Sequence, residues 1–342
     1  MSRPPRLADV ARAAGVSLAT ASRVLNGQAR PVGEPHRSKV LAAAQLLGYE
    51  PNTLAQAVAK GSSNVLGLIV HDVTDPYFGA IADGVMQEAE ESGLVVVLAV
   101  TRRDPERELD YLAMLRGQRA RAVILAGSRT TDADVNRRLA KELDAFRATG
   151  GGAAAISRNE LGIHTVVPEN RDAARDVAVR LHGLGHRRFA VLSGPATLVT
   201  AAERLGGFLD GRAGGGIDPS GVRVVPGAFT RPGGVAAATT LVTEGVPVTC
   251  VFAVNDVMAV GAMSAFRRAG VRVPDDVSIV GFDDIDTLRD VVPRLSSVRL
   301  PLEEMGRQAT RLALSGAPEP PTLVPVRGEV LLRESVRRLP SP

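Results

Sequence analysis

Residues 7–27 read LADVARAAGVSLATASRVLNG and contain two short helical patterns separated by a glycine. Apolar residues recur in the first half at helical spacing: Leu7, Val10, Ala11 and Ala14. This spacing predicts a short amphipathic helix over residues 6–13. Gly15 permits a sharp turn after it, because a positive φ costs glycine little. Ser17 is placed to cap a second helix over residues 18–25, so the segment predicts a helix-turn-helix.

A third helical pattern over residues 35–47 is expected to close a small core with the first two helices. The residues expected to face this core are Val40, Leu41, Ala44 and Leu47. A generic three-helix packing unit is the alternative interpretation, and composition alone does not exclude it.

The positive charge of the chain is concentrated at its beginning. Residues 1–60 hold eight Lys and Arg and three Asp and Glu, a net charge of +5, whereas the other 282 residues hold 33 and 34, a net charge of −1. A basic head on a nearly neutral body is typical of a nucleic-acid-binding module, although a solvated arginine-rich surface has the same composition. In such a module the second helix enters the major groove with its first residues against base edges.

The segment 7–27, together with LGYEPN at residues 47–52, resembles the head of the lactose-repressor (LacI/GalR) family of bacterial transcription regulators. The resemblance implies three base-reading residues, Leu18, Ala19 and Arg23. It also implies contacts to the DNA backbone by Ser17, Thr20, Ser22 and Asn26. Arg23 can bind guanine with two hydrogen bonds, whereas Leu18 and Ala19 offer only apolar contact. The operator half-site would therefore be read largely through one arginine and DNA shape.

Residues 51–60, PNTLAQAVAK, resemble the hinge helix of the same family, which orders on the operator as a pair. The residues that would reach the minor groove are Leu54, Ala55 and Val58. Val58 stands where the family has a leucine, so we expect a smaller DNA kink, or a wedge shared with Leu54, because valine is shorter. A linker helix without DNA contact is the alternative.

From residue 65 onward, short apolar runs alternate with helical patterns such as 77–92 and 105–116. The predicted strands are 65–70, 95–100, 122–125, 153–156, 165–167, 189–192, 222–225, 250–254, 277–281 and 296–299. This alternation predicts an α/β body with parallel sheets and crossover helices, in two halves. Ligands of such sheets bind beyond the carboxyl ends of the strands.

The residues that follow these strands are unusually polar and aromatic. The chain has 8 Phe and 3 Tyr, and four of these rings occupy such positions: Tyr77, Phe78, Phe229 and Phe282. Flat rings beside hydrogen-bond donors and acceptors suit a sugar or another small polar ring. The alternative is that Phe78 and Phe282 only fill the core.

The body resembles the periplasmic-binding-protein-like core of the LacI/GalR family, for example in VHDVTDPYFGAIADGV at residues 70–85 and VPDDVSIVGFDDI at residues 273–285. The resemblance implies two doubly wound parallel-sheet subdomains with an effector between them. The effector contacts it implies are Asp75, Tyr77, Phe78, Arg158, Arg204, Phe229, Asn255 and Asp283. Ser128 joins this set because it follows a predicted strand. Arg204 and Asp283 can together hold a hydroxyl-bearing ring, since one donates hydrogen bonds and the other accepts them.

The expected domains are a helix-turn-helix domain (1–50), a hinge helix and linker (51–61) and an effector-binding core (62–342). Within the core, one subdomain would hold residues 62–167 and 298–326, and the other residues 168–297 and 327–342. Crossings near Val167, Ser297 and Val326 would form a hinge whose closure an effector controls. We expect a homodimer on a pseudo-palindromic operator, and only seven residues follow Ser335, without the leucine heptads that make some relatives tetramers.

Other chemistry finds little support in the sequence. One cysteine, Cys250, excludes an internal disulfide and a cysteine-rich zinc site. The chain has no Walker loop and no GxSxG motif, and no third ligand accompanies His182 and His186, so we expect neither an enzyme nor a cofactor or metal. No apolar run approaches the roughly 18 residues of a membrane helix, and the N-terminus has no signal-peptide pattern, which predicts a cytoplasmic protein.

The leading hypothesis is a sugar-responsive transcription repressor that binds double-stranded DNA. A solute-binding protein for sugar uptake would share the fold of the body, but the basic helix-turn-helix opposes it. A carbohydrate-active α/β enzyme is a third possibility, which the lack of a paired catalytic constellation opposes.

Overall fold

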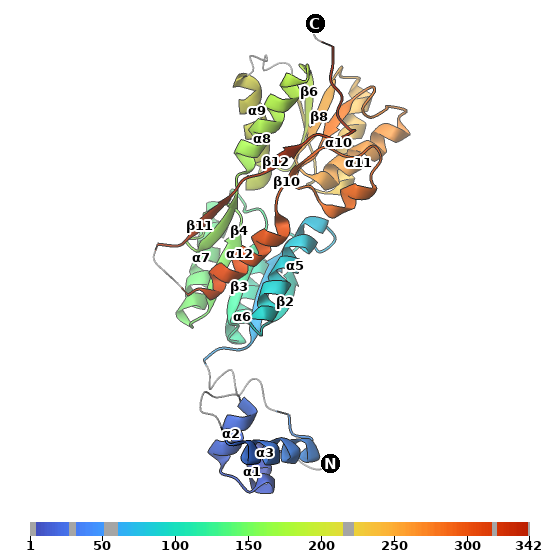
Figure 1. The fold of residues 1–342 in the computed structure, drawn as a ribbon. Helices are drawn as coiled ribbons and strands as arrows, with labels where there is room; N and C mark the ends of the chain where they lie inside the picture. The colour runs from blue at the N-terminus through green and yellow to red at the C-terminus, as the bar shows by residue number, and fades with distance from the viewer. Residues whose placement is uncertain (1–4, 27–31, 51–60, 215–221, 317–319, 341–342) are drawn as a thin grey trace. The chain divides into compact units, whose positions relative to one another are not determined.

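The structure is a computed structural model that describes residues 5–26, 32–50, 61–214, 222–316 and 320–340. The chain divides into two compact units, Met1–Asn64 and Val65–Pro342 (Figure 1). The first unit is the head and the second is the core. The predicted hinge segment 51–60, with Leu54, Ala55 and Val58, lies outside the described residues.

The described residues of the head form three helices, α1 (Leu7–Ala14), α2 (Leu18–Asn26) and α3 (Glu34–Leu47). The hydrophobic interior of the head consists of buried Val10, Ala11, Ala14, Ala21, Val40, Ala43 and Ala44. Two of the core residues predicted on α3 are wrong: Leu41 is 46% exposed and Leu47 is 37% exposed. Ala43 faces the core instead, because residues three and four positions after Val40 lie on the same face of a helix.

Local signals set the limits of these helices. Gly15 has φ 63°, and its N–H caps α1 by donating to the Arg12 carbonyl, while Val16 N–H donates to the Ala11 carbonyl. The Ser17 hydroxyl accepts a hydrogen bond of 3.1 Å from Thr20 N–H at the start of α2. The predicted helix-turn-helix is therefore confirmed.

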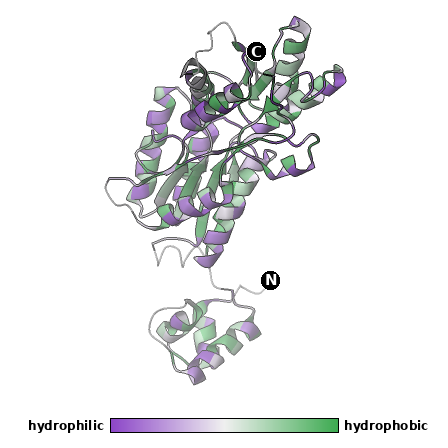
Figure 2. Cartoon of the chain, turned by 45° about the horizontal axis from the view of Figure 1, so that its top comes forward, coloured by the Kyte–Doolittle hydropathy of each residue, from purple (hydrophilic) through white to green (hydrophobic). Residues whose placement is uncertain are grey.

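The core begins with a six-stranded sheet in which every neighbouring pair is parallel. Its strands, in spatial order, are β11 (Leu323–Val326), β5 (His164–Pro168), β4 (Gly152–Ile156), β3 (Ala122–Ala126), β1 (Val65–Val70) and β2 (Val95–Val100). Successive residues of a strand point to opposite faces, and in β1 and β3 both faces are apolar and buried. Figure 2 shows such apolar strands lying between helices whose outward faces are polar.

Helices cover both faces of this sheet (Figure 1). Helices α6 (Pro105–Gly117) and α7 (Ala133–Ala148) bury Leu112, Leu115, Leu139 and Leu143 on one face. Helices α5 (Pro76–Glu91) and α12 (Leu302–Leu314) cover the other. The close approach of α5 and α12 requires Gly84, because a Cβ there would lie 1.9 Å from the Glu303 carbonyl oxygen.

A second parallel sheet forms the other half of the core. Its strands, in spatial order, are β7 (Val222–Pro226), β6 (Phe189–Ser193), β8 (Cys250–Ala253) and β9 (Ser278–Val280). Its helices are α8 (Asn170–Gly183), α9 (Val199–Gly214), α10 (Arg231–Glu244), α11 (Asp256–Arg268) and the 3₁₀ helix η2 (Asp286–Asp290). With this sheet the predicted fold class, a helix-turn-helix head and a doubly wound α/β core, is confirmed.

The chain passes between the two halves three times. It leaves the six-stranded sheet after β5, returns through β10 (Ser297–Arg299) into α12, and leaves again from β11 into β12 (Glu329–Leu331). Strands β10 and β12 form an antiparallel pair of their own. All ten predicted strands are present, whereas β11 and β12 were not predicted as strands.

Candidate functional site

The exposed side of α2 is the candidate DNA-reading surface. The predicted base-reading residues Leu18, Ala19 and Arg23 are exposed, with Leu18 54% exposed, whereas Ala21 on the opposite side is buried. Of the predicted backbone-contacting residues, Ser17 is exposed, and Thr20 and Ser22 are half-buried. Asn26 is the last residue of α2.

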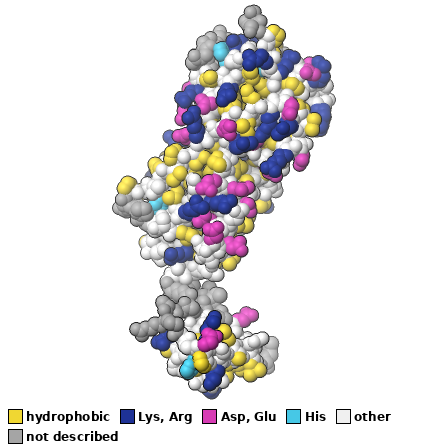
Figure 3. Space-filling model, viewed as in Figure 1, with side chains coloured by type: hydrophobic (Ala, Val, Ile, Leu, Met, Phe, Trp, Pro, Cys, Tyr) yellow, Lys and Arg dark blue, Asp and Glu magenta, His cyan; other side chains and the backbone are white. Residues whose placement is uncertain are grey.

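Two acidic residues of the head pair with arginines other than Arg23. Arg12 lies 3.6 Å from Asp9, and Arg37 lies 3.9 Å from Glu34. Within the described part of the head, no carboxylate oxygen lies within 4.0 Å of the Arg23 guanidinium. Figure 3 shows Lys and Arg side chains on the visible face of the head. Among the described residues of the head, no carboxylate therefore competes with a base edge or a phosphate for Arg23.

A cavity lies between the two halves of the core, at the carboxyl ends of their strands. Seven of the predicted effector contacts line it: Asp75, Tyr77, Phe78, Ser128, Arg204, Phe229 and Asp283. Further lining residues that we did not predict include His71, Arg103, Asn170 and Thr200. His71 and Arg103 follow β1 and β2, so inspection of every strand end would have found them.

A buried ion pair forms the polar wall of this cavity. The Arg204 guanidinium donates to Asp283 Oδ1 at 2.8 Å, to Asn170 Oδ1 at 2.9 Å and to the Val254 carbonyl at 2.8 Å. It stacks on the Phe282 ring, with 3.8 Å between the guanidinium carbon and the ring centroid. Burial raises the pKa of Asp283 above that of an ordinary aspartate, and the charge of Arg204 opposes this. The Phe282 ring is buried and does not line the cavity, whereas the Phe78 ring does.

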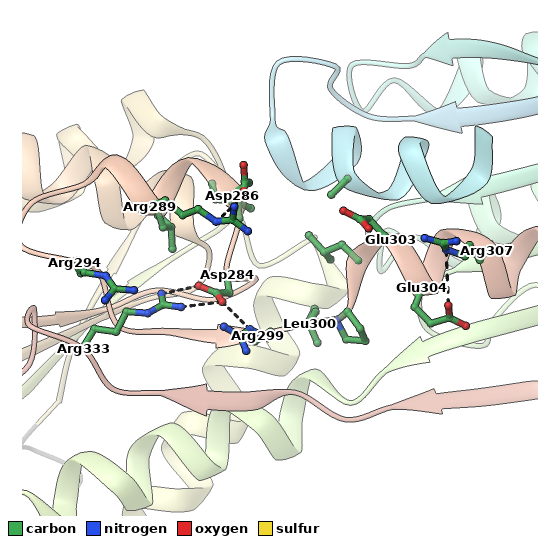
Figure 4. Close-up of a pocket in the computed structure, with 15 residues that line it drawn as sticks. Asp284, Asp286, Arg289, Arg294, Arg299, Leu300, Glu303, Glu304, Arg307 and Arg333 are labelled. Atoms are coloured by element: carbon green, nitrogen blue, oxygen red, sulfur yellow. Dashed lines mark hydrogen bonds and ion pairs between the residues drawn. The ribbon is translucent and has the colours of Figure 1, made fainter. Parts of the chain in front are cut away.

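The turn that carries Asp283 has a strained backbone. Asp283 has φ 114° and Asp284 has φ 56°, backbone angles that residues other than glycine rarely adopt. Asp284 lines a second cavity of about 500 Å³, where its carboxylate pairs with Arg299 at 3.0 Å and with Arg333 at 2.6 Å (Figure 4). These ion pairs tie the turn, at the residue that follows Asp283, to Arg299 on β10 and to Arg333.

On the opposite wall, Asp75 and Tyr77 begin α5. The Asp75 carboxylate caps the helix by accepting a 3.1 Å hydrogen bond from Tyr77 N–H. Burial raises the pKa of both side chains. The Tyr77 ring meets the Phe78 ring edge to face, with centroids 5.1 Å apart. This wall offers one acceptor beside two flat rings, which suits a hydroxylated ring.

The cavity is closed in this structure. Hydrogen bonds join its two halves: Thr131 N–H donates to the Thr197 carbonyl, Val199 N–H to the Arg129 carbonyl and Thr200 N–H to Ser128 Oγ, at 3.0 to 3.1 Å. The free space is about 40 Å³, room for a few water molecules at most. A sugar-sized molecule therefore enters only when these hydrogen bonds open and the halves separate.

Two predicted effector contacts do not line the cavity. Arg158 has an exposed side chain 3.5 Å from Glu160 and 3.8 Å from Glu203. Asn255 is buried and caps α11 by accepting from Met258 N–H at 3.0 Å. The Asn255 Nδ2 atom has no hydrogen-bond partner among the described residues. In the closed arrangement, Arg158 and Asn255 have no direct access to a ligand in the cavity.

Asp256 is a buried carboxyl beside this site. It accepts a hydrogen bond from the Ser297 hydroxyl at 2.6 Å and one from Ile285 N–H at 3.0 Å. Burial raises its pKa to about 8, and the charge of Asp283 acts in the same direction. Asp256 is therefore protonated in the folded protein at pH values where an ordinary aspartate is charged.

Replacement of Asp256 with asparagine is expected to flatten the pH dependence of stability. The folded state holds the Asp256 proton up to about pH 8, whereas the unfolded chain releases it near pH 4. Between these values the folded state binds more protons, so the free energy of unfolding falls as pH rises, by up to about 1.4 kcal/mol per pH unit. Urea unfolding of both proteins at several pH values in this window measures the difference. Parallel profiles would show that Asp256 does not titrate there.

Other sites are not evident in the described residues. Among them, no three or more His, Cys, Asp and Glu side chains lie together as a metal site requires. His186 is engaged by Thr249 Oγ1 at 3.1 Å and by the Arg337 carbonyl at 2.9 Å, so its role is structural. None of the described helices has both the length and the hydropathy needed to span a bilayer.

Comparisons with known proteins agree with this geometry. The family model "Bacterial regulatory proteins, lacI family" matches residues 6–52, and a periplasmic binding protein-like domain matches residues 178–336. The HTH-type transcriptional regulator GalS of Salmonella typhimurium is 36% identical over 90% of this chain and 89% of its own length.

Two solved structures cover nearly the whole chain. A lac repressor dimer bound to operator and the anti-inducer ONPF has a TM-score of 0.82 and 27% identity, over 98% of this chain and 100% of that one. A complex of the transcriptional regulator CelR with cellobiose has a TM-score of 0.70 and 31% identity, over 97% and 99%. Both similarities extend over the head, with its capped helix-turn-helix, and over the core, with its two parallel sheets. The chain therefore belongs to the lacI family of bacterial regulatory proteins, which are DNA-binding transcription regulators and not enzymes.

Proposed function

We propose that this regulator is a cytoplasmic repressor that binds a pseudo-palindromic operator as a homodimer. A small effector, a sugar or sugar derivative, binds in the cavity between the core halves and controls the affinity for DNA. The observation that carries the effector assignment is the buried Arg204–Asp283 pair facing a cavity between two α/β halves. One member of the pair donates hydrogen bonds and the other accepts them, as recognition of hydroxyl groups requires.

For DNA recognition, the support is the surface of α2. Leu18, Ala19 and Arg23 are exposed on one capped helix, and no described carboxylate neutralises Arg23. The related lac repressor is a dimer bound to operator. A two-fold dimer implies two copies of the half-site. The minor-groove residues Leu54, Ala55 and Val58 and the backbone contacts of Ser17, Thr20, Ser22 and Asn26 are part of this proposal.

The support for effector control is the connection of the two halves. Three chain crossings join them, and hydrogen bonds from Ser128–Thr131 to Thr197–Thr200 hold the cavity closed. The core can adopt an open and a closed arrangement of its halves. An effector that binds one arrangement more tightly than the other increases the population of that arrangement. The related CelR was solved with cellobiose, which agrees with a carbohydrate in such a cavity.

The test is a mobility shift of the full chain on genomic fragments that flank its gene, at two salt concentrations. We expect one fragment to stay bound at the higher salt concentration, because base contacts persist while pure phosphate binding decays steeply with salt. Binding that ignores sequence even at moderate salt would contradict the repressor assignment. Calorimetry with a panel of monosaccharides and disaccharides, with and without the operator fragment, then tests the effector.

A further inference from the structure

Arg103 is a half-buried cation that lines the cavity, and its guanidinium makes few hydrogen bonds within the protein. Its Nε is buried without a hydrogen-bond partner among the described residues. The one hydrogen bond recorded for its guanidinium is a long one, 3.4 Å from Nη2 to the Phe229 carbonyl across the cleft. The guanidinium carbon lies 5.8 Å from the centroid of the Phe229 ring. A buried, unsatisfied donor on a charged group is costly, so this arrangement calls for a partner.

The second arginine of the cavity shows the contrast. Arg204 fills three of its donor positions with Asp283, Asn170 and the Val254 carbonyl. No described carboxylate oxygen lies within 4.0 Å of Arg103. The charge of Arg204 is therefore neutralised within the protein, whereas that of Arg103 lacks an ion-pair partner in the described structure.

The acidic groups that face Arg103 are already engaged. Asp72 accepts from the Thr74 hydroxyl and N–H at 2.7 and 2.8 Å, and Asp75 accepts from Tyr77 N–H. The charges of Asp72 and Asp75 act on Arg103, yet burial outweighs them and lowers the pKa of Arg103. Arginine keeps its proton at physiological pH despite such a shift. Desolvation, and not ion pairing, dominates the surroundings of this guanidinium.

The backbone that presents Arg103 is strained and held by buried hydrogen bonds. Arg102 and Arg103 have φ of 55° and 62°. Arg103 N–H donates to Thr101 Oγ1 at 3.2 Å, and Thr101 Oγ1 lies 3.0 Å from His71 Nδ1. His71 Nε2 lies 3.0 Å from the Ser128 carbonyl. Since a carbonyl only accepts, Nε2 carries the proton, and the Thr101 hydroxyl donates to Nδ1. This network fixes Arg103 toward the cavity.

His71 adds no charge to the site, because burial and the nearby Arg129 lower its pKa to about 4. Asp283 and Arg204 balance each other. The guanidinium of Arg103, with two nitrogens in a rigid fork, matches the geometry of a carboxylate or a phosphate.

We propose that the effector is an acidic sugar derivative whose carboxylate or phosphate ester binds the guanidinium of Arg103. This inference rests on the proposed function, in which the cavity holds the effector. The sugar ring lies between Asp283 and the rings of Tyr77 and Phe229, and its hydroxyls bind Asp283 and Asp75. The acidic group takes the place of the long Arg103–Phe229 hydrogen bond, so that this cross-cleft contact breaks when the effector enters.

The experiment is calorimetry of the full chain with matched sets of sugars. The first set is glucose, glucuronate and glucose 6-phosphate, and the second is galactose, galacturonate and galactose 6-phosphate. We expect an acid or a phosphate to bind about 10- to 100-fold more tightly than its neutral parent, the usual effect of a charge-assisted hydrogen bond. Comparison of each uronate with the corresponding sugar phosphate shows whether the anionic group is a carboxylate or a phosphate ester.

Variants assign the preference to one side chain. Arg103→Gln should remove the difference between acidic and neutral sugars, and Arg103→Lys should keep part of it, because lysine retains the charge without the fork. The matched control is Arg102→Gln, since Arg102 shares the positive φ but is exposed and does not line the cavity. Operator binding by each variant in the mobility shift verifies its fold.

Each remaining outcome contradicts the proposal. A neutral sugar that binds as tightly as its acid overturns the assignment of Arg103 but leaves an effector in the cavity. An acid preference that survives Arg103→Gln overturns it too. Failure of every sugar to bind the wild-type chain contradicts the effector part of the proposed function, and this inference with it.

Discussion

Replacement of Asp283 with alanine is expected to abolish the response to the effector while operator affinity without effector stays unchanged. Asp283 Oδ1 accepts from Arg204, and its second oxygen has no recorded partner among the described residues. That oxygen is the acceptor that a ligand hydroxyl needs. Loss of a charge-assisted hydrogen bond costs about 1.5–3 kcal/mol, so effector affinity should fall by about 10- to 100-fold or more. Calorimetry measures the affinity, and a mobility shift with effector measures the response.

The alanine variant has a second effect that needs its own measurement. Arg204 and Asp283 are both buried, and removal of one partner leaves the other charge without its counterion. Such a loss costs about 3–5 kcal/mol of folding stability. Asp283→Asn is the better variant, because asparagine keeps the volume and tolerates a positive φ. It should lose the effector response while unfolding in urea at a concentration closer to that of the wild type.

A matched control lies three residues away in the same loop. Asp286 is an exposed carboxylate paired with Arg289 at 2.8 Å, and it does not line the effector cavity. Asp286→Ala should leave both the effector response and operator binding as they are. An unchanged response in Asp283→Asn would remove Asp283 from the effector site, and an equal loss in Asp286→Ala would point to the loop and not to the carboxylate.

The fold was predictable where the hydropathy of the residues on a strand matches the burial of that strand. Strands β1 and β3 are continuous apolar runs because helices cover both faces of the sheet, and such runs are visible in the sequence. Strands β11 and β12 are short, Pro325 lies within β11, and Gly328 lies between the two strands. Their pairing partners, β5 and β10, are set by the chain crossings and not by neighbouring residues. Only the three-dimensional structure therefore identifies them as strands.

The candidate site was predictable where its residues directly follow strands. Asp75 and Asp283 follow strands, and topology brings strand ends to one edge, so their meeting at one cavity follows from the sequence. Arg103 also follows a strand, but its direction depends on a left-handed backbone that arginine rarely adopts. Arg158 has a residue type and position suited to the site, yet its side chain stays exposed beside Glu160 and Glu203. Side-chain direction after a strand is set by local backbone angles that residue type does not reveal.

Replacement of Arg23 with alanine is expected to relax the preference for one base pair in each operator half-site. Arg23 is exposed on α2 and has no carboxylate within 4.0 Å among the described residues of the head. A bidentate contact to guanine is worth about 1–3 kcal/mol of discrimination, a factor of roughly 5 to 150. Leu18 and Ala19 carry no side-chain donor or acceptor, so no base-reading neighbour replaces the lost contact.

The measurement starts from an operator selected by the full wild-type chain out of a random DNA library. Mobility shifts of wild type and variant against every single base-pair substitution in one half-site then give the discrimination at each position. The control is Arg37→Ala on α3, whose guanidinium lies 3.9 Å from Glu34 and is not proposed to read bases. This control should leave the discrimination at every position unchanged.

Arg23→Lys separates a base contact from a phosphate contact. Lysine keeps the positive charge, and therefore most of the salt-dependent attraction to phosphates, but it lacks the planar fork that binds guanine with two hydrogen bonds. If Arg23 reads a base, lysine should restore non-specific affinity and its salt dependence while discrimination at the one position stays low. If Arg23 binds a phosphate, alanine should weaken binding to all sequences equally, and lysine should restore it equally. The two roles thus predict opposite patterns across the half-site, so one set of substituted operators decides between them.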